Sequence, residues 1–138
     1  MLLASAACIM LPAQRREDSL MRTAREFNDG LRWGREEEVT SCLSPVEAKG
    51  LQTRRADLGE DFVMADQEVK SVKVLPDADK ATVVAEFTWF NQRHAILQRS
   101  TIEQKWEWSD SHWVVASWRR VAGDRFPLVP EPLASARH

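Results

Sequence analysis

Apolar residues recur at every third or fourth position in the first part of the chain, which is the spacing of a helix that buries one face. This pattern predicts an amphipathic helix over residues 18–33, and Gly34 follows it as a stop signal. Two further helices are predicted over residues 35–43 and 45–58, the second with Ser44 as its cap. The apolar stripe of the first helix comprises Leu20, Ala24, Phe27 and Leu31.

From Phe62 onward apolar and polar residues alternate, a pattern that indicates half-buried strands. A change of parity in the first strand indicates a β-bulge near Lys70 and Ser71. The inward face of the second strand is predicted to carry Val83, Ala85, Phe87 and Trp89. The four predicted strands cover residues 62–75, 80–91, 96–108 and 112–119.

Helices that precede a run of antiparallel strands indicate an α+β fold. We expect the N-terminal helices to pack on a curved, antiparallel four-strand sheet, because they alone can cover its apolar face. The chain then divides into a signal and tether (1–17), one folded domain (18–122) and a proline-rich tail (123–138). Within that tail, Phe126 and Leu128 are expected to pack back on the domain.

The order of these elements resembles the nuclear transport factor two-like superfamily, which includes the ketosteroid isomerase-like and SnoaL-like proteins. The resemblance covers about residues 18–120 and implies a cone-shaped fold. Because that fold hosts both enzymes and non-catalytic modules, it does not by itself assign an activity. The segments that carry the resemblance are Thr23–Phe27, Leu31–Gly34, Glu36–Val39, Val72–Leu75, Ala81–Phe87, Gln104–Trp108 and His112–Val115.

Catalysis in that superfamily implies a carboxylate base in the cone and donors that stabilise an enolate. The chain has no Tyr, so the tyrosine part of such a donor pair is missing. Asp61 and Asp66 are the acids expected near the cone mouth, with a surface or turn role as the alternative for each. The three His residues lack zinc-ligand spacing, and no glycine-rich phosphate loop is present, so neither a metal nor a cofactor is expected.

The inward face of the third strand suggests a pocket. Aromatic walls with a few polar anchors suit a small amphipathic ligand. In the alternative interpretation the polar side chains pair with the helices or with water, and the cone is filled by its own side chains. The predicted walls are Phe87, Trp89 and Trp106, and the predicted anchors are Gln98, Ser100 and Gln104.

The first thirteen residues carry no charge and are too few to span a bilayer. Small residues lead up to Cys8 and resemble a bacterial lipoprotein signal, which predicts lipidation at Cys8 and a place on the periplasmic face of the cell envelope. The alternatives are ordinary cleavage near Ala6, giving a secreted or soluble periplasmic protein, and a buried N-terminal turn. If Cys8 is retained, it could pair with Cys42 in an oxidising compartment.

Composition narrows the choice of partner. With 19 Lys and Arg against 21 Asp and Glu, the net charge of −2 excludes a protein whose main task is to coat nucleic acid. The expected partners are therefore the membrane, a small molecule or protein, and a second copy packed sheet to sheet. The leading hypothesis is a non-catalytic, lipid-anchored domain, and the alternative is a small isomerase or hydrolase of the SnoaL-like class.

Overall fold

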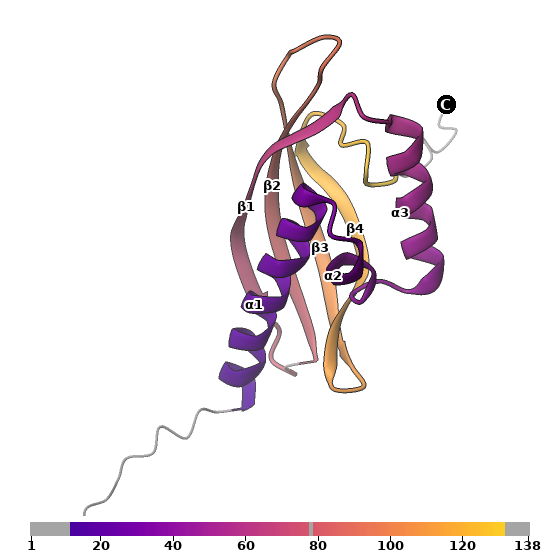
Figure 1. Ribbon diagram of the computed structural model, residues 1–138. Coiled ribbons are helices and arrows are strands. Elements are labelled where there is room, and N and C mark those ends of the chain that lie inside the picture. Colours follow the sequence, from indigo (N-terminus) through magenta and orange to yellow (C-terminus); the bar gives the residue numbers. More distant parts are fainter. Residues whose placement is uncertain (1–11, 78, 132–138) are drawn as a thin grey trace, which may run out of the picture.

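The computed structural model describes residues 12–77 and 79–131, and side chains from residue 15 onward (Figure 1). Three helices precede four strands, and the helices lie on one face of the sheet, which confirms the predicted α+β class. The elements are α1 (Pro12–Trp33), α2 (Glu36–Thr40), α3 (Pro45–Leu58), β1 (Phe62–Val74), β2 (Lys80–Asn91), β3 (Gln98–Ser109) and β4 (His112–Gly123).

Helix α1 begins six residues earlier than the sequence pattern predicts, so part of the expected tether is helical. Arg16 accounts for this extension, because its guanidinium pairs with Asp79 and lies 4.3 Å from the centroid of the Trp108 ring. Asp79 lies in the connection between β1 and β2, and Trp108 lies near the end of β3, beside the turn to β4. The first turns of α1 are therefore held against this end of the sheet. None of the helices in the described ranges is long and apolar enough to cross a bilayer.

Helices α2 and α3 differ in how well their bounds were predicted. Helix α2 stops at Thr40, and the turn after it brings the Cys42 carbonyl to the Val115 amide at 2.8 Å, where it covers the edge of β4. Helix α3 matches the prediction, because the Ser44 side chain accepts a hydrogen bond from the Glu47 amide at 3.2 Å. Gly59 ends α3 with a φ of +67°.

The sheet is a meander in the order β1-β2-β3-β4, with every neighbouring pair antiparallel. A register shift between Val69 and Ser71 confirms the predicted bulge. Another register shift, between Lys105 and Trp106 in the pairing of β3 with β4, lets Trp113, Val115 and Trp118 all face the core although they do not share one parity.

Strand β3 starts at Gln98, two residues later than predicted. Ile96 and Leu97 belong instead to the β2–β3 connection, where they are 65% and 66% exposed.

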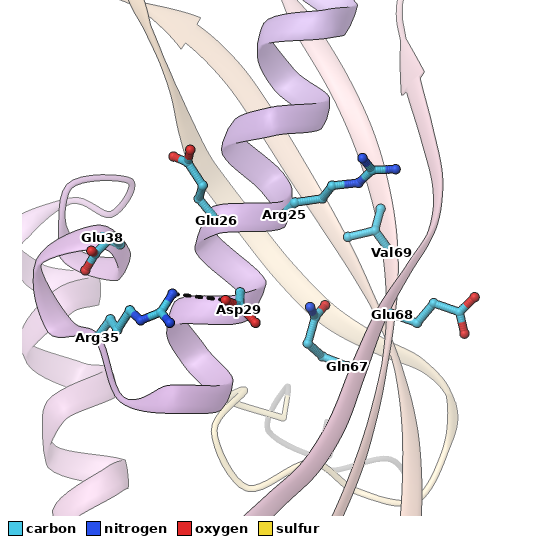
Figure 2. Close-up of a pocket in the computed structure, with 8 residues that line it drawn as sticks. All are labelled: Arg25, Glu26, Asp29, Arg35, Glu38, Gln67, Glu68 and Val69. Atoms are coloured by element: carbon cyan, nitrogen blue, oxygen red, sulfur yellow. Dashed lines mark hydrogen bonds and ion pairs between the residues drawn. The ribbon is translucent and has the colours of Figure 1, made fainter.

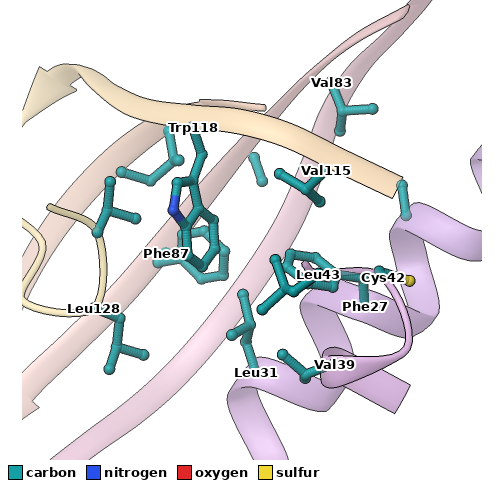
Figure 3. Close-up of a cluster of buried hydrophobic side chains, with 14 of the residues drawn as sticks. Phe27, Leu31, Val39, Cys42, Leu43, Val83, Phe87, Val115, Trp118 and Leu128 are labelled. Carbon is teal, nitrogen blue, oxygen red and sulfur yellow. The ribbon is translucent and has the colours of Figure 1, made fainter. Parts of the chain in front are cut away.

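The core lies between α1 and the inner face of the sheet (Figure 3). Phe27 of α1 meets Trp106 edge to face at 5.3 Å and also contacts Trp118 at 5.8 Å, measured between ring centroids. Phe87 stacks on Phe126 at 4.7 Å with an angle of 10° between the rings. Aromatic side chains from a helix, the sheet and the C-terminal segment thus fill the interior together.

Residues 124–131 are packed on the domain rather than extended away from it. Phe126, Leu128 and Val129 are buried, which confirms the expectation for the first two. The Arg54 side chain of α3 donates to the Leu128 carbonyl at 2.9 Å and holds this segment against the helices.

Candidate functional site

The six residues predicted to bind a ligand lie in the packed interior. Phe87, Ser100, Gln104 and Trp106 have no exposed surface, Trp89 is buried and Gln98 is half-buried. A side chain that borders a cavity large enough for water keeps accessible surface on that side. On the inward face of the sheet these four residues therefore border no such cavity, and the interior that was expected to hold a ligand is filled by side chains of the chain itself. Trp106 also lines a hollow of about 340 Å³ whose other walls include the charged residues Lys80 and Lys105.

The buried side chains of Asn28, Gln104 and Trp106 are hydrogen-bonded to one another, whereas the indole N–H groups of Trp113 and Trp118 are buried without a partner among the described residues. The Gln104 amide donates to Asn28 Oδ1 at 2.7 Å, and the Asn28 amide donates back to Gln104 Oε1 at 3.3 Å. The Trp106 indole N–H donates to the same Gln104 oxygen at 3.2 Å. This arrangement matches the alternative in which the inward glutamine pairs with a helix, because Asn28 belongs to α1.

Asn28 was not singled out from the sequence, although a signal for it was present. It follows Ala24 by four residues and so continues the buried stripe of α1 with a polar side chain. A buried amide requires hydrogen-bond partners, and its second donor contact is the Ala24 carbonyl at 2.8 Å.

Ser100 is also satisfied within the fold. Its hydroxyl accepts a hydrogen bond from the Trp89 indole N–H at 3.0 Å and donates to the Asp124 carbonyl at 2.5 Å. The serine therefore links β2, β3 and the C-terminal segment, and it has no adjacent base that would activate it as a nucleophile.

The two candidate acids lie at the surface. Asp61 forms an ion pair with Arg93 at 2.7 Å, and Asp66 is 69% exposed and lies 3.6 Å from Arg32. Neither carboxylate is in the interior, so their placement matches the surface role given as the alternative. Within the described ranges, no group of three His, Cys, Asp or Glu could hold a metal ion.

Cys42 is the buried titratable group of the core. Burial raises the pKa of its thiol, and the nearby Glu26 carboxylate adds to the rise, while the Ser41 hydroxyl partly offsets it. The thiol is therefore protonated near neutral pH and is a poor nucleophile. Cys8, the predicted lipidation site, lies outside the described residues.

The accessible hollows are on the outside of the domain. One of about 810 Å³ lies between α1, α2 and β1 and is open to solvent (Figure 2). Asp29 and Arg35 form an ion pair of 3.0 Å across part of it. We call it the lateral hollow, and its lining residues are Arg25, Glu26, Asp29, Arg35, Glu38, Gln67, Glu68 and Val69.

A second hollow of about 370 Å³ lies at the end of the domain where α1 begins. We call it the N-terminal hollow. It is lined by Arg15, Arg16, Ser19 and Trp108, and its exposed wall is mostly apolar.

Comparison with known proteins supports the fold and leaves the activity open. Neither a family model nor a curated protein matches the sequence. The intermembrane space region of the chloroplast protein ARC6 superposes with a TM-score of 0.52 and 17% identity, over 77% of this chain and 96% of that one. A protein of unknown function with a cystatin-like fold, from Nostoc punctiforme PCC 73102, gives 0.53 and 10% over 74% and 86%.

The chain has a cystatin-like α+β fold. This architecture agrees with the expected nuclear transport factor two-like layout of helices on a four-strand antiparallel sheet. At such low identity the likeness extends to the fold alone, so the function has to be argued from the chain's own surfaces.

Proposed function

We propose that this chain is a non-catalytic domain that binds another protein and is held at the bacterial cell envelope by its N-terminus. The observation that carries the proposal is the filled interior. Asn28, Ser100 and Gln104 are the buried polar residues of the described part, and all three are neutral and hydrogen-bonded.

Chemistry inside the cone would require an ionisable group beside the substrate, with a neighbour that positions it. The candidate acids Asp61 and Asp66 are instead partnered at the surface. A small ligand would also need a concave site that covers most of its area. Both arguments favour binding on the outside of the domain.

The lateral hollow suits a protein partner. It presents four carboxylates and two guanidinium groups on a wide, open surface. Charge of both signs on an accessible surface favours selection of a partner by complementary charge rather than enclosure of an apolar molecule. Glu26 and Glu38 also line a neighbouring hollow that reaches His112, so the charged surface continues around α1.

The envelope part of the proposal rests on the sequence before α1. Small residues precede Cys8, and Cys8 stands four positions before the first residue of α1. A lipid at Cys8 would therefore lie close to the folded domain.

Purification of the native protein from membranes, followed by mass analysis, tests both parts. We expect a chain that begins at a lipid-modified Cys8 and carries no small molecule. An intact Met1 with a free Cys8 thiol would refute the anchor. A stoichiometric co-purified ligand would refute binding by the outer surface alone.

Site-specific photo-crosslinking in cells tests the lateral hollow. A crosslinking amino acid in place of Glu38 is expected to yield one discrete protein adduct, whereas the same group in place of the exposed Lys49 on α3 is expected to yield none. Equal labelling from both positions would argue against this surface.

A homodimer through the sheet is a second part of the proposal. The outer face of the sheet carries cross-strand ion pairs, Glu86 with Arg99 at 3.7 Å and Glu103 with Arg119 at 3.3 Å. A polar face of this kind would give a reversible, salt-sensitive dimer. Sedimentation is expected to show a dimer fraction that falls with added salt, and a monomer at all concentrations would contradict it.

A further inference from the structure

The N-terminal hollow is a preformed feature of the fold. Trp108 meets Trp113 edge to face at 5.5 Å, and its backbone amide donates to the Asp79 carbonyl at 2.8 Å. Arg16 lies over the Trp108 ring and also pairs with Asp79. Three separate contacts thus fix the Trp108 side chain and the apolar wall it provides.

Arg15 borders the same hollow, but unlike Arg16 it is not held by Asp79 or Trp108. Its side chain is exposed, and within the described ranges it makes no ion pair. The hollow therefore combines the half-buried indole of Trp108 with the exposed guanidinium of Arg15. Tryptophan is enriched at the interface between a bilayer and water, and arginine binds phosphate oxygens in a planar, bidentate manner.

The chain that leads into this end of the domain is apolar. Residues 1–11 carry no charged side chain and directly precede Pro12. Four residues span at most about 14 Å when fully extended, so a lipid at Cys8 would keep the start of α1 near the membrane surface. The turns that join β1 to β2 and β3 to β4 lie at this same end (Figure 1).

We propose that the N-terminal hollow is a membrane-contact surface that takes the headgroup region of an anionic phospholipid bilayer. Trp108 lies at the interface, and Arg15 binds lipid phosphate. The inference rests on the proposed envelope location and adds an orientation to it. The β2–β3 connection, with its exposed Ile96 and Leu97, lies at the opposite end and points away from the bilayer (Figure 1).

The test uses the full chain with Cys8→Ser, which has no thiol for a lipid at that position and is expected to bind membranes reversibly. The probe is a vesicle of phosphatidylethanolamine and phosphatidylglycerol. An environment-sensitive dye on Ser19→Cys is expected to shift to a less polar emission when vesicles are added. The same dye on Gln92→Cys, an exposed position in the β2–β3 connection at the opposite end of the domain, is expected not to shift.

Charge variants give a second readout. Arg15→Gln is expected to weaken partitioning about fivefold, the usual contribution of one cationic side chain at an anionic surface. Arg25→Gln is the matched control, since it is exposed on the same helix ten positions further along, and it is expected to leave partitioning unchanged.

Two outcomes would overturn the inference. A chain that binds vesicles with no shift at Ser19→Cys would be tethered without contact between this surface and the bilayer. A Cys8→Ser chain that does not partition at all would also refute it, while the mass of the native N-terminus would still decide the lipid at Cys8 separately.

Discussion

The side-chain amides of Asn28 and Gln104 hydrogen-bond to each other in both directions, at 2.7 and 3.3 Å, across the contact between α1 and β3. The pair is fully buried, so neither amide can replace the other with water as a hydrogen-bond partner. It also fixes how α1 lies on the sheet, because the two residues are 76 positions apart in the sequence.

Removing one member of this pair is expected to destabilise the fold. Asn28→Leu or Gln104→Leu alone leaves the other amide buried without its partner, which lowers the free energy of unfolding by about 1–3 kcal/mol. The double variant Asn28→Leu with Gln104→Leu is expected to cost less than the sum of the two single changes, since neither amide is then left unpaired. Urea unfolding of the four proteins measures this coupling, and strictly additive losses would contradict it.

Phe126→Ala is expected to destabilise the domain by about 3–5 kcal/mol, because it removes a fully buried ring from the core. That ring stacks on Phe87, so the loss reaches the centre of the sheet. Arg125→Ala, one position earlier and exposed, is the control and is expected to change stability by at most about 0.5 kcal/mol. If thermal unfolding gave similar midpoints for both variants, residues 124–131 would not be part of the core.

Gly123→Ala is expected to be more destabilising than Gly59→Ala. Both glycines have positive φ, +76° and +67°, so both substitutions carry a backbone strain of about 1–3 kcal/mol. At Gly123 the added methyl group would also collide with the Arg99 carbonyl, whereas at Gly59 it would meet no atom within 4 Å. Chemical unfolding of the two variants compares them directly, and equal losses would show that the close approach at Gly123 is relieved by a backbone shift.

The raised pKa of the Cys42 thiol predicts that the folded protein loses stability in alkaline solution. The pKa of its thiol is raised in the folded protein, chiefly by burial, so the unfolded chain releases this proton at lower pH than the folded chain does. The free energy of unfolding therefore falls as pH rises above the unfolded value of about 8.5 towards the higher folded value. Unfolding between pH 7 and 10 should show a smaller decrease in Cys42→Ala than in the parent chain, and identical pH profiles would refute the assignment.

The helices and strands with regular sequence patterns could be predicted from the sequence, because short-range patterns encode them. Strand β2 has the predicted bounds, since its alternation of apolar and polar residues is unbroken. Helix α3 has the predicted bounds because Ser44 and Gly59 mark its two ends. Both signals are local and need no knowledge of the rest of the chain.

Features that depend on residues far apart in the sequence could not be predicted in this way. The early start of α1 depends on Arg16 and Asp79, which are 63 positions apart. Whether the interior is an open pocket depends on the total volume of the side chains that enter it. Alternation shows that Phe87 and Gln104 face inward, but it does not show whether the space between them is filled. That space is filled by Asn28 of α1, which hydrogen-bonds to Gln104, and by Phe126 of the C-terminal segment, which stacks on Phe87.

Two adjacent arginines of α3 bind backbone carbonyls in different parts of the chain. Arg55 donates to the Leu31 carbonyl at 2.5 Å, in the last turn of α1, and Arg54 donates to the Leu128 carbonyl at 2.9 Å. The last carbonyls of a helix have no partner within it, so Arg55 supplies one that α1 lacks. Detachment of α3 would expose the end of α1 and release residues 124–131 at once, which makes these three segments a single cooperative unit of local unfolding.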